Sequence, residues 1–379
     1  MPSVTAADRP APSPRLLPRS LSIYLDIVRF AAAFGVFASH LCQDKFSGGL
    51  LPWRVGSYGT LCVTLFFVLS GYVIAHSLRS NGGGGLGYAR DRLSRLYSVA
   101  LPCLILTALF DAIGSRIDPA LYVNPFAEGK VGAVATYLAS LFFVNEYGVF
   151  SFGGIAPGTN APYWSLSFEA TYYLVAGAVI FLPRLPGLLL SVGILALAGQ
   201  TILALFGLWI GGYLLYTHLF YRDRGALTAA LLLGSTILLV QMPAIELHLR
   251  ADNFGFFFPW GRGAWNRNLL SDYLVGFAFL IHIAAARRVA EACPHALDRI
   301  GGLCRRLGGY TFPLYCIHLP AMTLLRALSP WPSNDPRTLA LIVAGVMGLT
   351  VVLTPACDRL RSALRQPGRR RTAAAGASL

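Results

Sequence analysis

Long apolar runs, separated by short polar segments, occupy most of the chain. Ten of them reach or approach the roughly 20 residues that a helix needs to cross a bilayer. They lie at about 21–41, 58–78, 97–113, 162–183, 187–205, 206–221, 225–243, 269–286, 308–328 and 338–356. A shorter apolar piece at 131–144 predicts an interfacial or re-entrant helix within a long loop. The pattern predicts an all-α polytopic membrane protein with about ten transmembrane helices in one bundle.

The segment 187–221 permits two interpretations, one long helix or two helices joined by a tight turn at Gly207. The basic residues distinguish them, because cytoplasmic loops carry an excess of Lys and Arg. With ten helices and a cytoplasmic N-terminus, 21 of the 31 basic residues fall inside and 8 outside, while Arg29 and Arg326 lie within apolar runs. A single helix would invert everything that follows, so we expect two helices and both termini in the cytoplasm.

Composition agrees with a membrane protein, because only 13% of the residues are charged, against roughly 25% in soluble domains. The net charge of +14 would suit nucleic acid, but the basic residues lie between apolar runs, so we expect no nucleic-acid partner. Residues 1–20 and 359–379 are expected to be disordered cytoplasmic tails around a transmembrane domain at 21–358. The basic C-terminal tail would be attracted to anionic lipid.

The seven cysteines show neither a CxxC pair nor a Cys/His ligand spacing, so no metal site is expected. The topology places Cys42 and Cys62 near one membrane face. A disulfide between them is conceivable, although small apolar filler is the simpler interpretation of most of the cysteines.

The first apolar run, "LDIVRFAAAFGVFASHL", carries three ionisable side chains: Asp26, Arg29 and His40. Helical periodicity places all three on one face, with Arg29 and His40 about 16 Å apart along the axis. A charge in the bilayer core costs roughly 3 kcal/mol or more unless it faces protein or water. The three groups indicate either a functional face or a structural Asp26–Arg29 pair with a core histidine.

A second polar set opens the run "YWSLSFEATYYLV". The topology places Glu169 in the outer half of the membrane, at the same depth as His40. A carboxylate beside an imidazole would fix its tautomer and raise its basicity, which suits a general base. Ser167 lies nearby, and Trp164 has the alternative interpretation of an interfacial anchor.

The cytoplasmic segment "ARDRLSRLY" concentrates Arg90, Arg92 and Arg95. These arginines form either an ordinary positively charged flank or a clamp for a phosphorylated donor, because guanidinium binds phosphate through two parallel hydrogen bonds. Further along, "GYTFPLYCIHLP" places His318 near mid-membrane, as either a functional or a core histidine.

The order of these segments resembles the membrane-bound acyltransferase-3 family of bacterial integral-membrane O-acyltransferases. "LDIVRFAAAFGVFASHL" is similar to its opening helix, with an Arg, ten residues and a His, and "TLFFVLSGYVIAHSL" to its FFxLSG helix. "RDRLSRLY", "YWSLSFEATYYL" and "YTFPLYCIHLP" resemble its Arg-x-x-Arg, W-S-L-x-x-E and late Tyr/His segments. Ala170 replaces a second acid and Ser98 a proline that the family often has, which leaves the subfamily open.

The resemblance implies that His40 is the catalytic residue, as a general base or a transient acyl carrier. It implies that Arg29 is essential on the same helix and that Glu169 belongs to the core site. Further candidates for that site are Asp26, Ser70, Trp164, Ser167 and His318.

The resemblance also implies the two substrates. Arg92 and Arg95, assisted by Arg90, would bind acyl-CoA, most commonly acetyl-CoA, from the cytoplasm, with no metal. The acceptor would be a hydroxyl of a carbohydrate or lipid-linked glycan, as in cell-surface or exopolysaccharide modification at the bacterial inner membrane, with membrane lipids as the other partners.

Two other functions also fit a polytopic chain. A transporter or flippase of a lipid-linked saccharide is the main alternative, because it too needs ten helices and buried charges. A structural or sensory membrane protein gives no reason for His40 and Glu169 to share a depth. The acceptor sugar, the acyl chain and the oligomeric state are not specified by the sequence.

Overall fold

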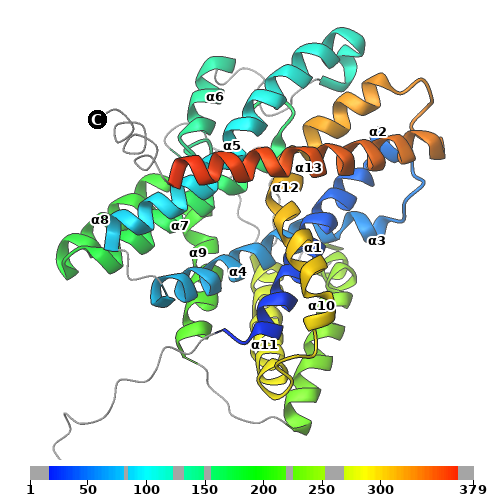
Figure 1. Cartoon of the computed structure of the whole chain (residues 1–379). Helices are drawn as coiled ribbons and strands as arrows, with labels where there is room; N and C mark the ends of the chain where they lie inside the picture. The colour runs from blue at the N-terminus through cyan, green and yellow to red at the C-terminus, as the bar shows by residue number, and fades with distance from the viewer. Residues whose placement is uncertain are drawn as a thin grey trace, which may run out of the picture.

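The computed structural model describes residues 17–80, 84–122, 132–148, 155–218, 225–251 and 269–365, and these residues form helices and loops without a strand. The long helices, shown in Figure 1, are α1 (Arg19–Leu41), α4 (Tyr58–Ser80), α5 (Gly84–Ile117), α7 (Trp164–Phe181), α8 (Arg184–Ala198), α9 (Gln200–Thr217), α10 (Ala226–Ala251), α11 (Leu269–Ala292), α12 (Gly301–Leu328) and α13 (Pro336–Arg365). The predicted all-α fold is confirmed, and each predicted apolar segment is helical over most of its described residues.

Among the described residues, eight helices are long and apolar enough to cross a membrane by length and composition. Two of the predicted spans do not meet both conditions. α8 is apolar but only 15 residues long, and α12 carries three arginines and two prolines: Arg305, Arg306, Arg326, Pro313 and Pro320. A polytopic membrane protein is therefore supported, while ten crossings stay a prediction.

The break between α8 and α9 lies at Gly199, whereas the sequence analysis predicted a turn at Gly207. Gly199 has φ +94° and ψ 174°, a backbone conformation that L side chains avoid. Gly207 lies inside α9, and a Cβ there would fall 2.4 Å from the hydroxyl oxygen of Tyr273. Two helices are confirmed, but the predicted turn was wrong because Gly207 serves close packing against α11.

Shorter helices complete the described chain: α2 (Asp44–Ser47), α3 (Trp53–Gly56), η2 (Pro119–Tyr122), α6 (Ala133–Leu141), η3 (Ala161–Tyr163) and η4 (Asp298–Ile300). α6 is the short helix predicted at 131–144. The hydroxyls of Tyr97 and Tyr163 donate to the carbonyl oxygens of Leu141 and Ser140, each at 3.1 Å. These bonds attach the end of α6 to α5 and to the entrance of α7.

α4 and α9 approach each other backbone to backbone. A Cβ at Gly71 would lie 1.9 Å from the carbonyl oxygen of Trp209, and one at Gly212 would lie 2.0 Å from that of Val68. Small residues at a crossing let membrane helices touch closely. The glycine of the FFxLSG segment therefore has a packing role, which fixes α4 against the rest of the bundle.

Contacts near the ends of α1 and α12 show which of these ends lie on the same side of the bundle. At one end, Arg19 of α1 pairs with Asp298, just before α12, at 3.0 Å. At the other end, the Nε of Arg326 in α12 donates to the carbonyl oxygen of Lys45, just after α1, at 3.1 Å. α1 and α12 therefore run parallel, as the predicted topology requires, while the side that faces the cytoplasm stays a prediction.

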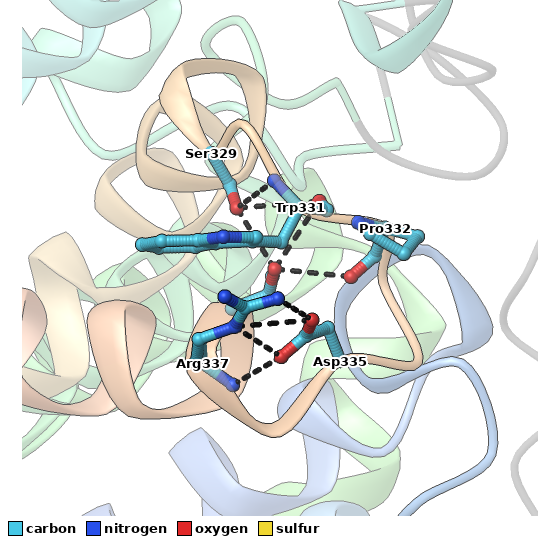
Figure 2. A network of polar contacts seen from close by, with 6 residues as sticks. Ser329, Trp331, Pro332, Asp335 and Arg337 are labelled. Atoms are coloured by element: carbon cyan, nitrogen blue, oxygen red, sulfur yellow. Dashed lines mark hydrogen bonds and ion pairs between the residues drawn. The ribbon is translucent and has the colours of Figure 1, made fainter.

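A polar network closes the turn between α12 and α13 (Figure 2). Asp335 caps α13, because its Oδ1 accepts the backbone N–H of Arg337 at 2.8 Å and its Oδ2 accepts the guanidinium at 2.7 Å. Pro336 follows at the first helical position, where proline is favoured. The guanidinium also lies 4.9 Å from the ring centre of Trp331. Hydrogen bonds from the Arg337 side chain and backbone hold the pKa of Asp335 below its usual range, so the cap stabilises the fold above the unfolded pKa and is lost as pH falls.

α13 crosses α5 and α12 (Figure 1) and continues to Arg365. The predicted boundary at 358 is therefore wrong for 359–365, which are helical. Within this stretch, Arg361 and Arg365 lie 3.8 and 3.0 Å from Asp91 of α5. The rest of the predicted tails lies outside the described residues, apart from 17–20, where α1 begins at Arg19.

All seven cysteines are free, so the conceivable disulfide between Cys42 and Cys62 is not formed. Cys62 is buried against α1, where a Cβ on Gly35 would lie 2.6 Å from its Sγ. Cys42 instead points its thiol toward the carbonyl oxygen of Pro52, at 3.9 Å.

Candidate functional site

A cavity of about 150 Å³ lies between α1, α4, α5, α7 and α12. Since about 10–15 Å³ accommodates one water by this measure, the space holds several waters or a small acyl group. Its polar lining consists of Arg29, Ser70, Arg92, Arg95, Ser165, Glu169, Tyr173, Thr311 and Tyr315. Five of the predicted site residues thus meet around one space, although they come from four different helices.

Arg29 enters this cavity from α1. Its Nη1 donates to Asp26 Oδ1 at 3.2 Å, and the two side chains are equally half-buried. Gly308 of α12 makes room for the pair, because a Cβ there would lie 2.9 Å from the Cβ of Asp26. Asp26 itself does not line the cavity. It orients Arg29 and compensates part of its charge.

Arg92 and Arg95 enter from α5, one helical turn apart. Arg92 is buried and donates to Ser77 Oγ at 2.7 Å and to Asp91 Oδ2 at 2.6 Å. Its guanidinium also lies 5.6 Å from the ring centre of Tyr173 on α7. Arg90 is exposed and does not line the cavity, so two of the three predicted arginines face this space.

Glu169 enters from α7 and accepts a hydrogen bond from the hydroxyl of Tyr173, one turn further along the same helix. Arg95 lines the same cavity as both residues, and the carboxylate of Glu169 attracts its guanidinium electrostatically. The carboxylate therefore belongs to the arginine-lined part of the site. There it balances part of the positive charge.

His40 and His318 form a pair, with ring centres 5.2 Å apart. His318 is fully buried, and its Nδ1 lies 2.9 Å from the carbonyl oxygen of Tyr315. A carbonyl only accepts, so Nδ1 carries the proton, and the lone pair of the neutral ring lies on Nε2. That Nε2 is buried and has no hydrogen-bond partner among the described residues. On the exposed side, Nδ1 of His40 lies 3.0 Å from Nε2 of Gln43.

The histidine pair lies just beyond the cavity. Tyr315 lines the cavity, and its ring centre is 6.2 Å from that of His318, one turn further along α12. In the part of the chain that the structure describes, neither a hydrogen bond nor a ring contact joins His40 to Glu169. The predicted carboxylate–imidazole contact is therefore replaced by an imidazole–imidazole contact, because the packing of α12 against α1 brings His318 closer.

Of the remaining predicted residues, one lines the cavity and two have packing or loop-holding roles outside it. Ser70 lines the cavity and accepts the indole N–H of Trp209 at 3.2 Å. Trp164 is buried, with its ring centre 4.9 Å from that of Phe168, so it is a core residue here rather than an interfacial anchor. Ser167 is buried outside the cavity lining.

Ser167 fixes the loop that precedes α7. Its hydroxyl donates to Asn145 Oδ1 at 2.7 Å, and Asn145 Nδ2 donates to the carbonyl oxygen of Ile155 at 3.1 Å. Burial raises the pKa of the adjacent Glu146 to about 8, so this carboxyl is largely protonated at neutral pH. The loop is therefore held by neutral hydrogen bonds close to the start of α7.

Sequence reasoning did not assign roles to Tyr173 and Tyr315. The hydroxyl of Tyr315 donates to Ser165 Oγ at 2.7 Å, which links α12 to α7 at the cavity wall. Tyr173 had a readable signal, because it follows Glu169 by four residues and therefore shares its helix face. Tyr315 precedes His318 by three residues, but its partner on α7 depends on tertiary packing.

The arrangement combines guanidinium groups for an anion with an imidazole for proton transfer. Among the described residues, no group of three or more His, Cys, Asp or Glu side chains is placed to hold a metal ion. The cationic part and the imidazole pair are separated along α1 by the eleven helical steps from Arg29 to His40, about 16 Å. A ligand that contacts both must be long and must carry its negative charge at one end.

Comparison with known proteins gives one family match over most of the chain. The family model described as an acyltransferase domain matches residues 22–357. Acyltransferase MdmB of Streptomyces mycarofaciens is 30% identical over 151 residues, which are 39% of this chain and 36% of that protein. An O-acetyl transferase of Shigella phage Sf6 is 26% identical over 159 residues, 41% of this chain and 45% of that protein. The chain thus spans less than half the length of either curated relative, and no solved structure matches.

Proposed function

Because the chain belongs to the acyltransferase-3 family, we propose that it is a multi-pass O-acyltransferase of the bacterial inner membrane. It transfers an acyl group, acetyl in the first instance, from cytoplasmic acyl-CoA to a hydroxyl of a carbohydrate or lipid-linked glycan. The modification of cell-surface or exopolysaccharide glycans is the role we assign to it. The observation that carries the proposal is the cavity shared by Arg29, Arg92, Arg95 and Glu169, with the His40–His318 pair just beyond it.

The donor occupies the cationic part of the site. Arg92 and Arg95 bind its phosphates, since guanidinium forms paired, charge-assisted hydrogen bonds with phosphate. Arg29 also acts on the donor rather than on the developing oxyanion, because about 16 Å of helix separates it from His40, further than an arginine side chain reaches. Glu169 and Tyr173 act as positioning residues for Arg95.

His40 performs the proton transfer. Its Nδ1 accepts the proton of the acceptor hydroxyl, in place of its present contact with Gln43, while the hydroxyl oxygen attacks the thioester carbonyl carbon. The C–S bond then breaks, and the departing thiolate takes the proton from His40. An acyl group carried on His40 is the second route through the same residue.

His318 acts as a positioning residue for His40. Its buried Nε2 lone pair has no hydrogen-bond partner within the described parts of the chain, so it is available to accept the Nε2–H of His40 and to stabilise the imidazolium that forms. This fixes the tautomer of His40 and leaves Nδ1 on the exposed side, toward the acceptor.

The test uses purified protein with labelled acetyl-CoA, following transfer to a glycan acceptor and slow hydrolysis to free CoA. We expect His40→Ala to abolish both activities while its expression and membrane insertion stay normal. His295→Ala, which removes a largely exposed histidine on another loop, is the matched control and should retain activity. Normal transfer by His40→Ala would overturn the assignment, and a wild-type protein that moves glycan without consuming acetyl-CoA would favour a transporter.

A further inference from the structure

A cluster of charged side chains joins the last two turns of α13 to α5. Asp91 lies at its centre, with Oδ2 at 2.6 Å from Nη2 of Arg92. Its Oδ1 lies 3.0 Å from Nη2 of Arg365 and 3.8 Å from Nη2 of Arg361. We call Asp91, Arg92, Arg361 and Arg365 the Asp91 cluster. Arg361 and Arg365 lie beyond residue 357, where the family match ends.

The Asp91 cluster has more positive charge than its carboxylate can compensate. One carboxylate serves three guanidinium groups, which leaves a surplus of two positive charges. Arg361 also lies close enough to Arg95 for mutual repulsion. The Nε atoms of Arg92 and Arg361 are buried and have no hydrogen-bond partner in the described residues. A buried guanidinium with an unused donor is costly, so the cluster is better suited to receive an anion than to brace two helices.

The cluster is open to solvent on one side and continuous with the cavity on the other. The side chains of Arg361 and Arg365 are 37% and 50% exposed, whereas that of Arg92 is 7% exposed and lines the cavity. An anion that reaches Arg361 and Arg365 from the aqueous side therefore lies at the entrance to the space lined by Arg92 and Arg95.

We propose that Arg361 and Arg365 of α13, together with Arg92, form a diphosphate-binding site for which Asp91 is the exchangeable counter-ion. A diphosphate carries at least the two negative charges that the cluster lacks, and its oxygens accept paired guanidinium bonds. The proposal rests on the proposed function and deepens it, because the ligand class is the nucleotide diphosphate end of the acyl donor. α13 then closes the donor site from outside the matched family region.

Both the nucleotide diphosphate of a donor and the phosphate of an anionic lipid headgroup offer this chemistry. We assign the nucleotide, because Arg92 is buried within the bundle and lines the cavity that would receive the rest of the donor. The experiment below separates the two sources.

The experiment measures equilibrium binding of ADP and of CoA to the full-length protein in an uncharged detergent. We expect Arg361→Ala with Arg365→Ala to raise the dissociation constant for ADP about tenfold or more, which corresponds to about 1.4 kcal/mol. Arg361→Lys with Arg365→Lys should retain part of the affinity, because charge is kept while the guanidinium fork is lost. Arg359→Ala removes an exposed arginine from the same helix and is the matched control, with unchanged affinity.

Asp91→Asn should change the affinity for ADP in the opposite direction from the arginine variants, and this distinguishes ligand binding from a purely structural role. If Asp91 competes with the ligand, its removal should tighten ADP binding several-fold and enlarge the thermal stabilisation that pyrophosphate gives. If it only braces α13 against α5, the variant should bind ADP more weakly or equally, and the proposal would be overturned. A melting curve without ligand confirms that each variant is folded.

The outcomes separate this inference from the proposed function. Wild-type binding of ADP that is unchanged in the double alanine variant overturns this inference alone. A wild-type protein that binds neither ADP nor CoA overturns it together with the donor assignment. If the double variant loses association with phosphatidylglycerol vesicles but keeps its ADP affinity, the arginines bind lipid headgroups and the nucleotide assignment is wrong.

Discussion

Several candidate functional residues of this protein could be recognised in the sequence, but the residues that they contact could not. A charge or an imidazole within an apolar run is expensive in a bilayer, so Arg29, His40 and Glu169 could be selected from the sequence. Their partners come from elsewhere in the chain. His40 contacts His318, 278 positions away, and Glu169 bonds to Tyr173. The sequence therefore predicted which types of side chain the site uses, but not which side chains contact each other.

Replacement of His318 tests the imidazole pair. We expect His318→Ala to lower kcat by about tenfold or more, because His40 loses the group that fixes its tautomer, while the KM for acetyl-CoA changes little. His318→Gln should restore part of kcat, since its amide oxygen can accept the same proton. A purely structural histidine would lower the amount of folded protein without this split between kcat and KM. Equal loss in both variants would contradict the proposed role.

A few particular residues determine where helices in this protein begin, end and cross. Asp335 followed by Pro336 starts α13, and this signature is visible in the sequence. The break at Gly199 and the crossing at Gly71 and Gly212 are not, because many glycines look alike along the chain and only the packed neighbour distinguishes them. Helix existence was predicted for all ten long helices, whereas the turn between α8 and α9 was misplaced.

Glycine-to-alanine changes test the α4–α9 crossing. Gly212→Ala places a Cβ 2.0 Å from a carbonyl oxygen, so the helices must separate, at a cost of about 1–3 kcal/mol in the free energy of unfolding. Gly193→Ala in α8 has open space around its new Cβ and should be neutral or slightly stabilising. Thermal unfolding in detergent measures both variants. Equal melting temperatures for the two would show that the crossing is not tightly packed in solution.

The whole molecule is a bundle in which the arginines of the cavity and the histidine pair lie at different levels along α1. Charge distribution along the chain predicts which end faces the cytoplasm, and the parallel course of α1 and α12 agrees with that topology. The predicted orientation would put the Asp91 cluster on the cytoplasmic side, where acyl-CoA is made. It would put Gln43 and His40 nearer the other side, where an exported glycan would be found.

Two native cysteines report this orientation. Cys293 is exposed after α11, and Cys42 is half-exposed after α1, at the opposite end of the bundle. In intact spheroplasts, a membrane-impermeant maleimide should label Cys42 but not Cys293, and permeabilisation should expose Cys293 as well. Cys42→Ala and Cys293→Ala identify each signal. Labelling of Cys293 in intact spheroplasts would show that the predicted topology is inverted, and the proposed donor side would then be wrong as well.

The sequence by itself determined the fold class, the ten long helices and the short list of chemically active residues, because hydropathy and the cost of buried charge act locally along the chain. It also marked Arg29, Arg92, Arg95 and Glu169 as candidate site residues, but it placed Glu169 beside His40 rather than beside the arginines. Only the tertiary structure decided which groups meet. The separation of Glu169 from His40, the contact between His40 and His318, and the approach of Arg361 and Arg365 to Asp91 all depend on helix rotation and crossing. Those are set by side-chain packing between segments far apart in the chain.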